Sequence, residues 1–343
     1  MRKLLNTLYV SSQGSYLRKE GETVVVERER EKVLQLPAHT IGGIVCFGDV
    51  LCSPFLLGFC AEKGIGISFL SEHGRFLASV RGPVSGNVLL RRQQYRLADD
   101  MGATKAIAEH IVAGKLANTR VVMNRALRDH AERIDAEAVR RASASIDRII
   151  DDLPRAADAD SVRGLEGMAA AEYFAVFNNF IVDQKDAFVF TDRNRRPPLD
   201  PVNSLLSFVY TLLAHDMRSA IETVGLDPAV GFLHRDRPGR PGLALDLMEE
   251  FRPSIADRLV LSLINRRQVD ARGFKRAENG AIVMDDTTRK AVLVEYQNRK
   301  QDEVSHTYLD EKVPVGLLFF VQANLMARFI RGDIDGYPPF FWR

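Results

Sequence analysis

The sequence predicts a multidomain α+β protein: a small N-terminal β-strand domain with one inserted helix, followed by a large all-α C-terminal domain. Residues 1–84 consist of short runs rich in valine, leucine, tyrosine and threonine, separated by glycine-containing turns. Between residues 85 and 343, apolar residues recur instead at the three- and four-residue spacing of helices. The pair Gly82 and Pro83, which is typical of a hinge, separates the two patterns.

Strands are predicted in the N-terminal part over residues 4–10, 15–18, 23–27, 32–36, 41–47, 65–70 and 75–80. Glycine turns such as the one at His73 and Gly74 are typical of hairpins, so an antiparallel sheet is expected. One helix interrupts the strands, because Ser53 can cap its first turn, Pro54 fits the next position and Gly64 can end it.

The C-terminal part is expected to be a series of helices. The first begins near residue 88, breaks near Gly114 and resumes over residues 117–130. Asp200 and Pro201 form a cap and first-turn pair for a later, strongly apolar helix. Further helices are predicted at 136–153, 168–181, 201–224, 243–251, 253–265, 287–299 and 309–330, with a small hairpin at 274–284.

Composition excludes several classes of protein. A net charge of +2 excludes a simple basic tail for nucleic acid, although the chain has 36 arginines against 11 lysines. Arginine grips phosphates bidentately, but a GC-rich genome also favours arginine, and composition leaves both explanations open. No apolar run reaches the ~18 residues of a membrane span, and the N-terminus turns polar too soon for a signal peptide. Three cysteines without CxxC spacing favour a reducing cytoplasm, where we expect the protein to work.

An acidic pair is the first candidate for chemistry. Asp246 and Glu249 are three residues apart, so they project from one face of a predicted helix. Two adjacent carboxylates repel unless they share a cation or a proton. A solvated acidic face is the alternative explanation of the same spacing.

His234 and Glu166 are the other candidate ligands. His234 lies in an arginine-rich loop a dozen residues before the acidic pair, and Glu166 stands between glycines that allow close approach of a ligand. A structural histidine and a first-turn glutamate satisfying free N–H groups are the alternatives. One histidine with two or three carboxylates is an oxygen-rich site that suits magnesium or manganese.

Arginines near these residues are candidates for contacts with nucleic-acid phosphates, and solvated loops or an ordinary helix surface are the alternatives. The candidates are Arg91, Arg92, Arg193, Arg195, Arg196, Arg235, Arg237 and Arg240. The sequence contains no Walker loop, GxSxG or zinc-finger spacing, so nucleotide hydrolysis, serine hydrolase chemistry and structural zinc are disfavoured.

Several segments together resemble the universal CRISPR adaptation endonuclease/integrase family. They are 86–95 (GNVLLRRQQY), 164–167 (GLEG), 193–203 (RNRRPPLDPVN), 225–234 (GLDPAVGFLH) and 246–253 (DLMEEFRP). The segments 337–340 (YPPF) and 295–301 (EYQNRKQ) are similar to the I-C subtype of that family. The resemblance extends from the first predicted strand to the C-terminus, with the motifs in family order.

The resemblance implies a metal-dependent DNA endonuclease and integrase that inserts short foreign DNA fragments into the repeat array. By motif, the catalytic and metal-binding residues are Glu166, His234 and Glu249, with Asp246 as a possible additional acid. The cofactor implied is a divalent metal, magnesium or manganese. Some family members have Asp where this chain has Glu249.

The family resemblance also implies partners: DNA fragments and repeat DNA, a second copy of the chain joined through the β domain to form a homodimer, and a small ferredoxin-like protein of the adaptation complex. Two other functions fit the same residues. One is a stand-alone metal-dependent nuclease acting on branched or single-stranded DNA, and the other is a non-catalytic DNA scaffold.

Overall fold

The computed structural model describes residues 6–72, 76–80, 82 and 88–342. The described chain forms two compact units, and the first unit ends at Ser85 but also takes in Met284–Gln297. The predicted turn at His73 and Gly74 and the Pro83 half of the predicted hinge lie outside the described residues. A domain boundary at residues 84 and 85 stays a prediction.

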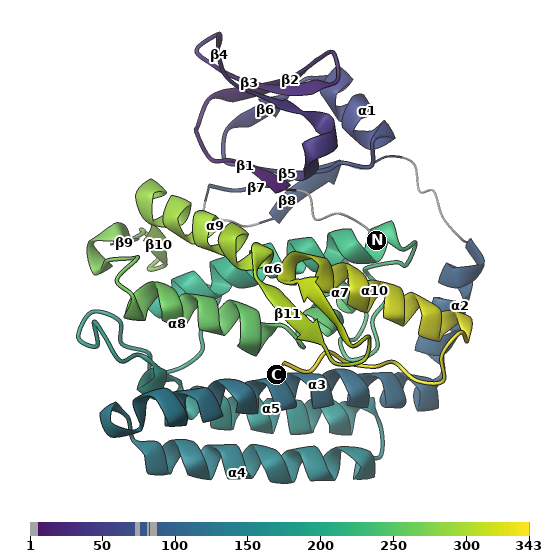
Figure 1. Cartoon of the computed structure of the whole chain (residues 1–343), viewed down its shortest axis with the longest axis vertical. Coiled ribbons are helices and arrows are strands. Elements are labelled where there is room, and N and C mark those ends of the chain that lie inside the picture. The colour runs from purple at the N-terminus through teal and green to yellow at the C-terminus, as the bar shows by residue number, and fades with distance from the viewer. Residues whose placement is uncertain (1–5, 73–75, 81, 83–87, 343) are drawn as a thin grey trace. The chain divides into compact units, whose positions relative to one another are not determined.

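The first unit contains two four-stranded sheets (Figure 1). One sheet has the order β1 (Asn6–Val10), β5 (Ile41–Phe47), β7 (Gly66–Leu70) and β8 (Phe76–Val80). The other has the order β4 (Glu31–Pro37), β3 (Thr23–Arg28), β2 (Ser15–Glu20) and β6 (Val50–Cys52). The predicted strands are therefore present, and the short β6 is an addition that the sequence reasoning missed.

The predicted antiparallel pairing is only partly correct. β5 pairs in parallel with both β1 and β7, and β2 pairs in parallel with β6, while β2, β3 and β4 are antiparallel. Parallel neighbours need a crossover connection, and the segment containing β6 and α1 (Pro54–Glu62) supplies it between β5 and β7.

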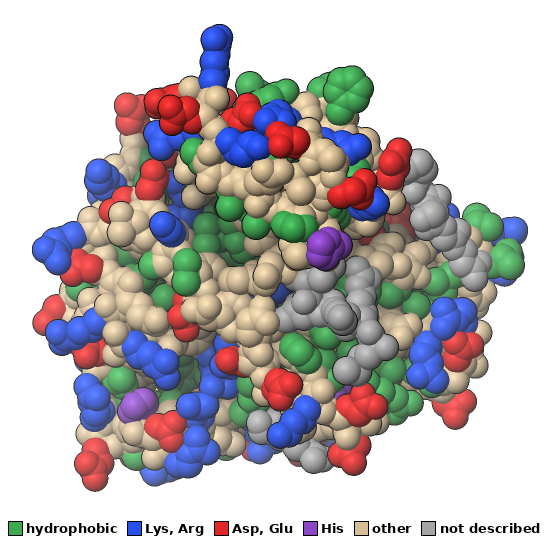
Figure 2. Space-filling view, turned by 45° about the horizontal axis from the view of Figure 1, so that its top comes forward, with side chains coloured by type: hydrophobic (Ala, Val, Ile, Leu, Met, Phe, Trp, Pro, Cys, Tyr) green, Lys and Arg blue, Asp and Glu red, His purple; other side chains and the backbone are tan. Residues whose placement is uncertain are grey.

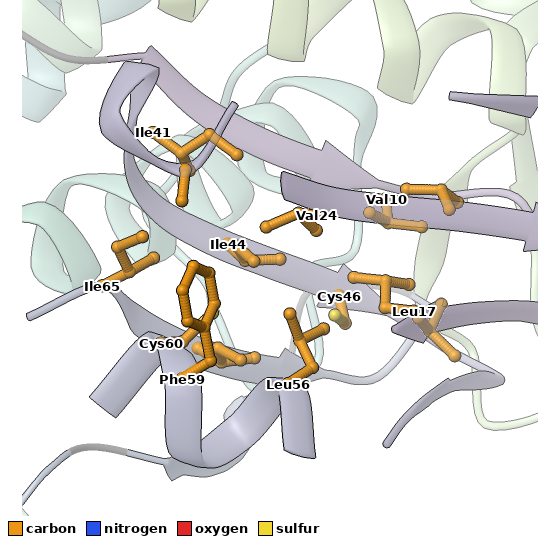
Figure 3. Packing of buried hydrophobic residues seen from close by; sticks show 14 residues of the cluster. Val10, Leu17, Val24, Ile41, Ile44, Cys46, Leu56, Phe59, Cys60 and Ile65 are labelled. Atoms are coloured by element: carbon orange, nitrogen blue, oxygen red, sulfur yellow. The ribbon is translucent and has the colours of Figure 1, made fainter. Parts of the chain in front are cut away.

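The inserted helix α1 is confirmed, together with its cap. The Ser53 hydroxyl accepts a hydrogen bond from the Leu56 amide at 3.2 Å, and Pro54 occupies the first turn. Leu56 and Phe59 pack into an apolar cluster with Ile44 and other strand residues (Figure 3). This cluster, drawn from both sheets and α1, is the core of the first unit.

The second unit is largely helical. Its helices are α2 (Val88–Asp99), α3 (Met101–His130), α4 (Ala136–Asp152), α5 (Ala159–Val176), α6 (Pro201–Thr223), α7 (Gly242–Met248), α8 (Arg258–Asn265) and α10 (Val315–Arg331), with a π-helix at Arg252–Asp257. α3, α4 and α5 pack against one another in a layer (Figure 1). None of the described helices is both long and apolar enough to cross a membrane.

An all-α second domain is not what the structure shows. β9 (Phe274–Arg276) pairs with β10 (Ile282–Met284), as the predicted hairpin required, and β11 (Glu303–His306) pairs with β12 (Glu311–Pro314). The second pair overlaps the helix predicted at 309–330, which begins only at Val315. Residues 286–297 of α9 (Asp286–Gln301) belong to the first unit by their contacts.

The predicted break near Gly114 is also wrong, because α3 is continuous from Met101 to His130. The chain breaks earlier, where Asp100 caps α3 by accepting a hydrogen bond from the Ala103 amide at 2.8 Å. A Cβ atom on Gly114 would lie 2.8 Å from Cβ of Pro339, so this glycine serves close packing rather than helix termination.

α5 begins at Ala159, nine residues before the predicted start at residue 168. Asp158 caps it by accepting a hydrogen bond from the Ser161 amide at 2.7 Å. Glu166 therefore lies in the middle of a helix, and the alternative that it satisfies N–H groups of a first turn is excluded.

Candidate functional site

Glu166 and Glu249 both meet the ammonium group of Lys115. Lys115 Nζ contacts Glu166 Oε1 and lies 2.6 Å from Glu249 Oε2. Lys115 comes from the middle of α3, Glu166 from α5, and Glu249 directly follows α7. The side chains of Lys115 and Glu249 are only 11% and 3% exposed and that of Glu166 is 21% exposed, so the shared cation is largely buried and Glu166 lies on its more open side.

Arg252 supplies a second positive charge to Glu249. Its Nη1 atom lies 2.5 Å from Glu249 Oε1, and its guanidinium lies over the ring of Tyr210 at 4.3 Å. Burial would raise the pKa of Glu249, but the charges of Arg252 and Lys115 outweigh burial and lower the pKa to about 2. Glu249 is therefore ionised at neutral pH.

Lys115 is charged as well. Burial by itself lowers the pKa of an ammonium group, but the charges of Glu249 and Glu166 act in the opposite direction and leave the pKa of Lys115 raised. The centre of the site is therefore a buried ionic cluster of Glu166, Lys115, Glu249 and Arg252.

Asp246 holds His234 in place. Its Oδ1 atom accepts from the His234 amide at 2.9 Å and lies 2.7 Å from His234 Nδ1. Its Oδ2 atom accepts from the amides of Phe232 and Leu233, at 2.6 and 3.0 Å. The engagement of Nδ1 leaves Nε2 as the imidazole nitrogen available to a ligand, which makes Asp246 a positioning group for His234.

Two other elements hold the loop that carries His234. Arg163, one turn before Glu166 on α5, donates from Nε to the Leu233 carbonyl at 2.9 Å. Gln94 of α2 donates from Nε2 to the carbonyls of Asp227 and Val230, each at 2.8 Å. The orientation of His234 therefore depends on α2, α5 and α7 together.

The donor set suits a hard divalent cation. It offers two carboxylates and one imidazole, and the buried Glu249 Oε2 lies 2.6 Å from the Lys115 ammonium. Across the described ranges, however, no three histidine, cysteine, aspartate or glutamate side chains are grouped closely enough to hold an ion. The two glutamates converge on Lys115, so the predicted ligands share one region without forming a closed ligand shell.

A cavity of about 210 Å³ opens beside Lys115 and Glu166. Its lining includes Tyr210, Asp257 and Arg195. The Tyr210 hydroxyl donates to Asp257 Oδ1 at 2.6 Å, and burial raises the pKa of Asp257 to about 6 despite that bond and nearby arginine charges. The cavity thus combines aromatic and cationic walls next to the ionic cluster.

The candidate DNA-binding arginines have different surroundings. Arg193 is held internally, since its guanidinium donates to Asn203 Oδ1 at 2.6 Å and to Ser207 Oγ at 3.2 Å. Arg235 pairs with Asp160 at the start of α5. The exposed members are Arg92, Arg195, Arg196, Arg235 and Arg237, and the half-buried ones are Arg91, Arg193 and Arg240.

Three of these arginines lie near one another. Partial burial and the charges of Arg237, Arg195 and Arg163 lower the pKa of Arg240, although Asp246 acts in the opposite direction. The repulsion of Arg240 by these arginines is a cost that an anionic ligand would relieve. On the face shown in Figure 2, basic and acidic side chains are interspersed, as a near-neutral surface requires.

Sequence reasoning missed Lys115 and did not give Arg252 a role. One signal was present: Lys115 interrupts the apolar face of α3, four residues after the buried Ile111. A lysine on a buried helix face needs an acidic partner, but sequence spacing does not say which one.

Fold and site together define a protein with a β-sheet unit and a helical unit that contains a carboxylate-rich ionic centre. The sequence profile described as CRISPR associated protein Cas1 matches residues 8–298. The chain therefore belongs to the Cas1 family of CRISPR-associated proteins, and the resemblance seen in its motifs is confirmed at this level.

Curated relatives agree with this assignment, and solved structures share the fold. A CRISPR-associated endonuclease Cas1 of Chlorobaculum tepidum is 56% identical over 343 residues, which cover 100% of both chains. A Cas1 structure from Thermotoga maritima has a TM-score of 0.81 at 24% identity, covering 95% of this chain and 97% of that one. A casposase bound to integration product has a TM-score of 0.86 at 22% identity, covering 99% and 95%.

Proposed function

We propose that this protein is a metal-dependent DNA endonuclease and integrase of CRISPR adaptation, which inserts short foreign DNA fragments into the repeat array. One observation carries the proposal: Glu166 and Glu249, from different helices, converge on a single positive centre, and Asp246 fixes His234 through Nδ1. The Cas1 relative that shares 56% identity over the full chain is named an endonuclease, which supports a phosphodiester substrate.

The proposed reaction is a transesterification. A 3′-hydroxyl of the fragment attacks a phosphodiester at the edge of a repeat, a new phosphodiester bond forms, and the 3′-oxygen of the cut strand leaves. Magnesium or manganese held by Glu166, His234 and Glu249 would stabilise negative charge on the phosphoryl oxygens. The arginines around Arg240 add positive charge for the DNA backbone, while Arg252 keeps Glu249 ionised and in position.

Further parts of the proposal concern assembly. We propose a homodimer formed through the β-sheet unit, and a small ferredoxin-like partner protein that holds the fragment together with it. The tail and helix motifs at 337–340 and 295–301 support assignment to the I-C subtype. A repeat array is chromosomal DNA, so the proposed place of action is the cytoplasm.

The test is strand transfer with purified protein, its partner, a fragment with free 3′ ends and a supercoiled repeat array. Glu166→Ala, His234→Ala and Glu249→Ala should each abolish joining and leave binding of duplex DNA largely intact. Glu172→Ala, a half-buried glutamate on the same helix as Glu166, is the matched control and should join normally. Normal joining by a correctly folded His234→Ala variant would contradict the proposal.

The same assay distinguishes the alternatives. Cleavage of branched or single-stranded DNA without any joining would identify a stand-alone nuclease. Absence of both cleavage and manganese-dependent stabilisation of the fold would identify a non-catalytic scaffold.

A further inference from the structure

We propose that Lys115 is an internal counter-cation: it occupies the bridging position between Glu166 and Glu249, and a divalent ion must displace it to bind there. The inference rests on the proposed function, because that function supplies the ion. It adds a residue with a defined role in metal exchange, and it explains why the predicted ligands share a region without forming a closed shell.

The geometry places one positive charge between two negative ones. The Lys115 ammonium contacts a carboxylate oxygen of Glu166 and lies 2.6 Å from one of Glu249. A cation bridging two carboxylates in this way does electrostatically what a metal ion bound to both would do. The Lys115 ammonium group and a divalent ion would therefore compete for the same two carboxylate oxygens.

Charge balance explains why a lysine is needed there. The buried cluster contains Glu166 and Glu249 against Lys115 and Arg252, so its four charges cancel. Without Lys115, Arg252 pairs with Glu249 only, and the negative charge of the half-buried Glu166 is left without a partner beside it. Buried uncompensated charge is strongly destabilising, so the metal-free protein depends on the lysine.

The two cations are held differently. The guanidinium of Arg252 lies over the Tyr210 ring and contacts Glu249 Oε1, so two interactions fix its position. The Lys115 ammonium instead contacts one oxygen of each carboxylate, Glu166 Oε1 and Glu249 Oε2, which are oxygens that a divalent ion would use. Lysine is a point charge on a flexible stem, which makes Lys115 the cation that can withdraw when a doubly charged ion arrives.

The test measures manganese binding and thermal unfolding of Lys115→Met protein, independently of DNA joining. Removing the competing charge should tighten Mn²⁺ binding by about tenfold or more in isothermal titration. In EDTA the variant should unfold at a lower temperature than wild type, because the cluster is no longer neutral. Added Mn²⁺ should raise its unfolding temperature by more than it raises that of wild type.

Two further variants separate charge from packing. Lys105→Met removes a lysine of the same helix that pairs with Glu109 at 2.7 Å, and it should bind Mn²⁺ like wild type. The double variant Lys115→Met with Glu166→Gln is neutral again, so it should recover the unfolding temperature in EDTA and show little Mn²⁺ response. If Lys115→Met alone does not fold, recovery in the double variant supports the counter-cation role.

Several outcomes overturn the inference. They are weaker or equal Mn²⁺ binding by Lys115→Met compared with wild type, and failure of the double variant to regain stability. Equal binding by both proteins overturns the inference and leaves the proposed function standing. Failure of both wild type and Lys115→Met to bind Mn²⁺ overturns the two together, whereas binding by the variant alone would support displacement.

Discussion

Asp246 and Glu249 illustrate how two acids on one helical turn take different roles. Both are almost fully buried, yet Glu249 faces the cations Lys115 and Arg252, while Asp246 accepts from three successive backbone amides and the His234 ring. A carboxylate with this many donors has little capacity left for an ion. We therefore expect Asp246 to act on metal binding through His234.

Asp246→Asn tests that role. The amide offers one acceptor oxygen in place of two, so at least one amide of the His234 loop loses its partner and the imidazole loses its orienting charge. We expect Mn²⁺ affinity to fall about 10–100-fold, the usual effect of losing such a supporting group. Isothermal titration measures it directly.

Asp227→Asn is the control for this substitution. Asp227 lies in the same loop and binds the Tyr95 hydroxyl and the Ala229 amide, and no described contact joins it to His234. Unchanged Mn²⁺ affinity in Asp246→Asn, or an equal loss in Asp227→Asn, would show that Asp246 does not act through the histidine.

Residue spacing on the sequence brought Asp246 and Glu249 to one face, but it could not assign their partners. The ligand candidates Glu166, His234 and Glu249 were recognised by motif. Lys115 was missed because its partners lie 51 residues or more along the chain, and tertiary packing alone brings them together.

At the scale of elements, α3 shows that a glycine inside a helix can serve close packing with another segment instead of ending the helix. Gly114 was predicted to break the helix, as glycine's low helix propensity suggests. The structure places it against the C-terminal segment, where a Cβ atom would lie 2.8 Å from Pro339 Cβ and 3.3 Å from Glu250 Cγ. The same segment is fixed by Glu250, which accepts hydrogen bonds from the Tyr337 hydroxyl and the Phe340 amide.

Gly114→Ala should therefore destabilise the protein although alanine favours helices. Overpacking of this kind costs about 1–3 kcal/mol, which exceeds the gain in propensity. Gly164→Ala in α5 is the matched control, since nothing lies within 4 Å of a Cβ atom there, and it should be neutral or stabilise by up to about 1 kcal/mol. Urea unfolding of both variants measures the change in the free energy of unfolding. Equal changes in the two variants would contradict the packing explanation.

The starts of α1 and α6 were predicted correctly, because each is capped by a residue directly before it in the sequence, Ser53 and Asp200. Local signals failed at the start of α5, which was predicted at residue 168. Asp158 caps this helix, but it was not recognised as a cap from the sequence. The parallel pairing of β5 with β1 and β7 also depends on long-range packing. The alternation of apolar residues and the turn residues between strands do not determine it.

At the scale of the whole molecule, a net charge of +2 conceals a local gathering of arginines. On α4, Arg141 is exposed and pairs with Glu137, so its charge is compensated nearby. Arg240 instead lies close enough to Arg195 and Arg237 for their charges to lower its pKa. Composition alone left codon bias and phosphate binding undecided, and these surroundings favour phosphate binding for the second group.

The salt dependence of DNA binding tests whether the arginines around Arg240, and not those of α4, contact phosphates. Each lost phosphate contact lowers the slope of log Kobs against log salt concentration by about 1, because fewer counterions are released. Replacing Arg195, Arg237 and Arg240 together with alanine should weaken duplex binding for every sequence and reduce the slope by about 3. Replacing Arg140, Arg141 and Arg148, exposed arginines of α4, removes the same formal charge and should leave the slope nearly unchanged. Equal losses in the two triple variants would show that total charge, rather than the arginines around the site, controls binding.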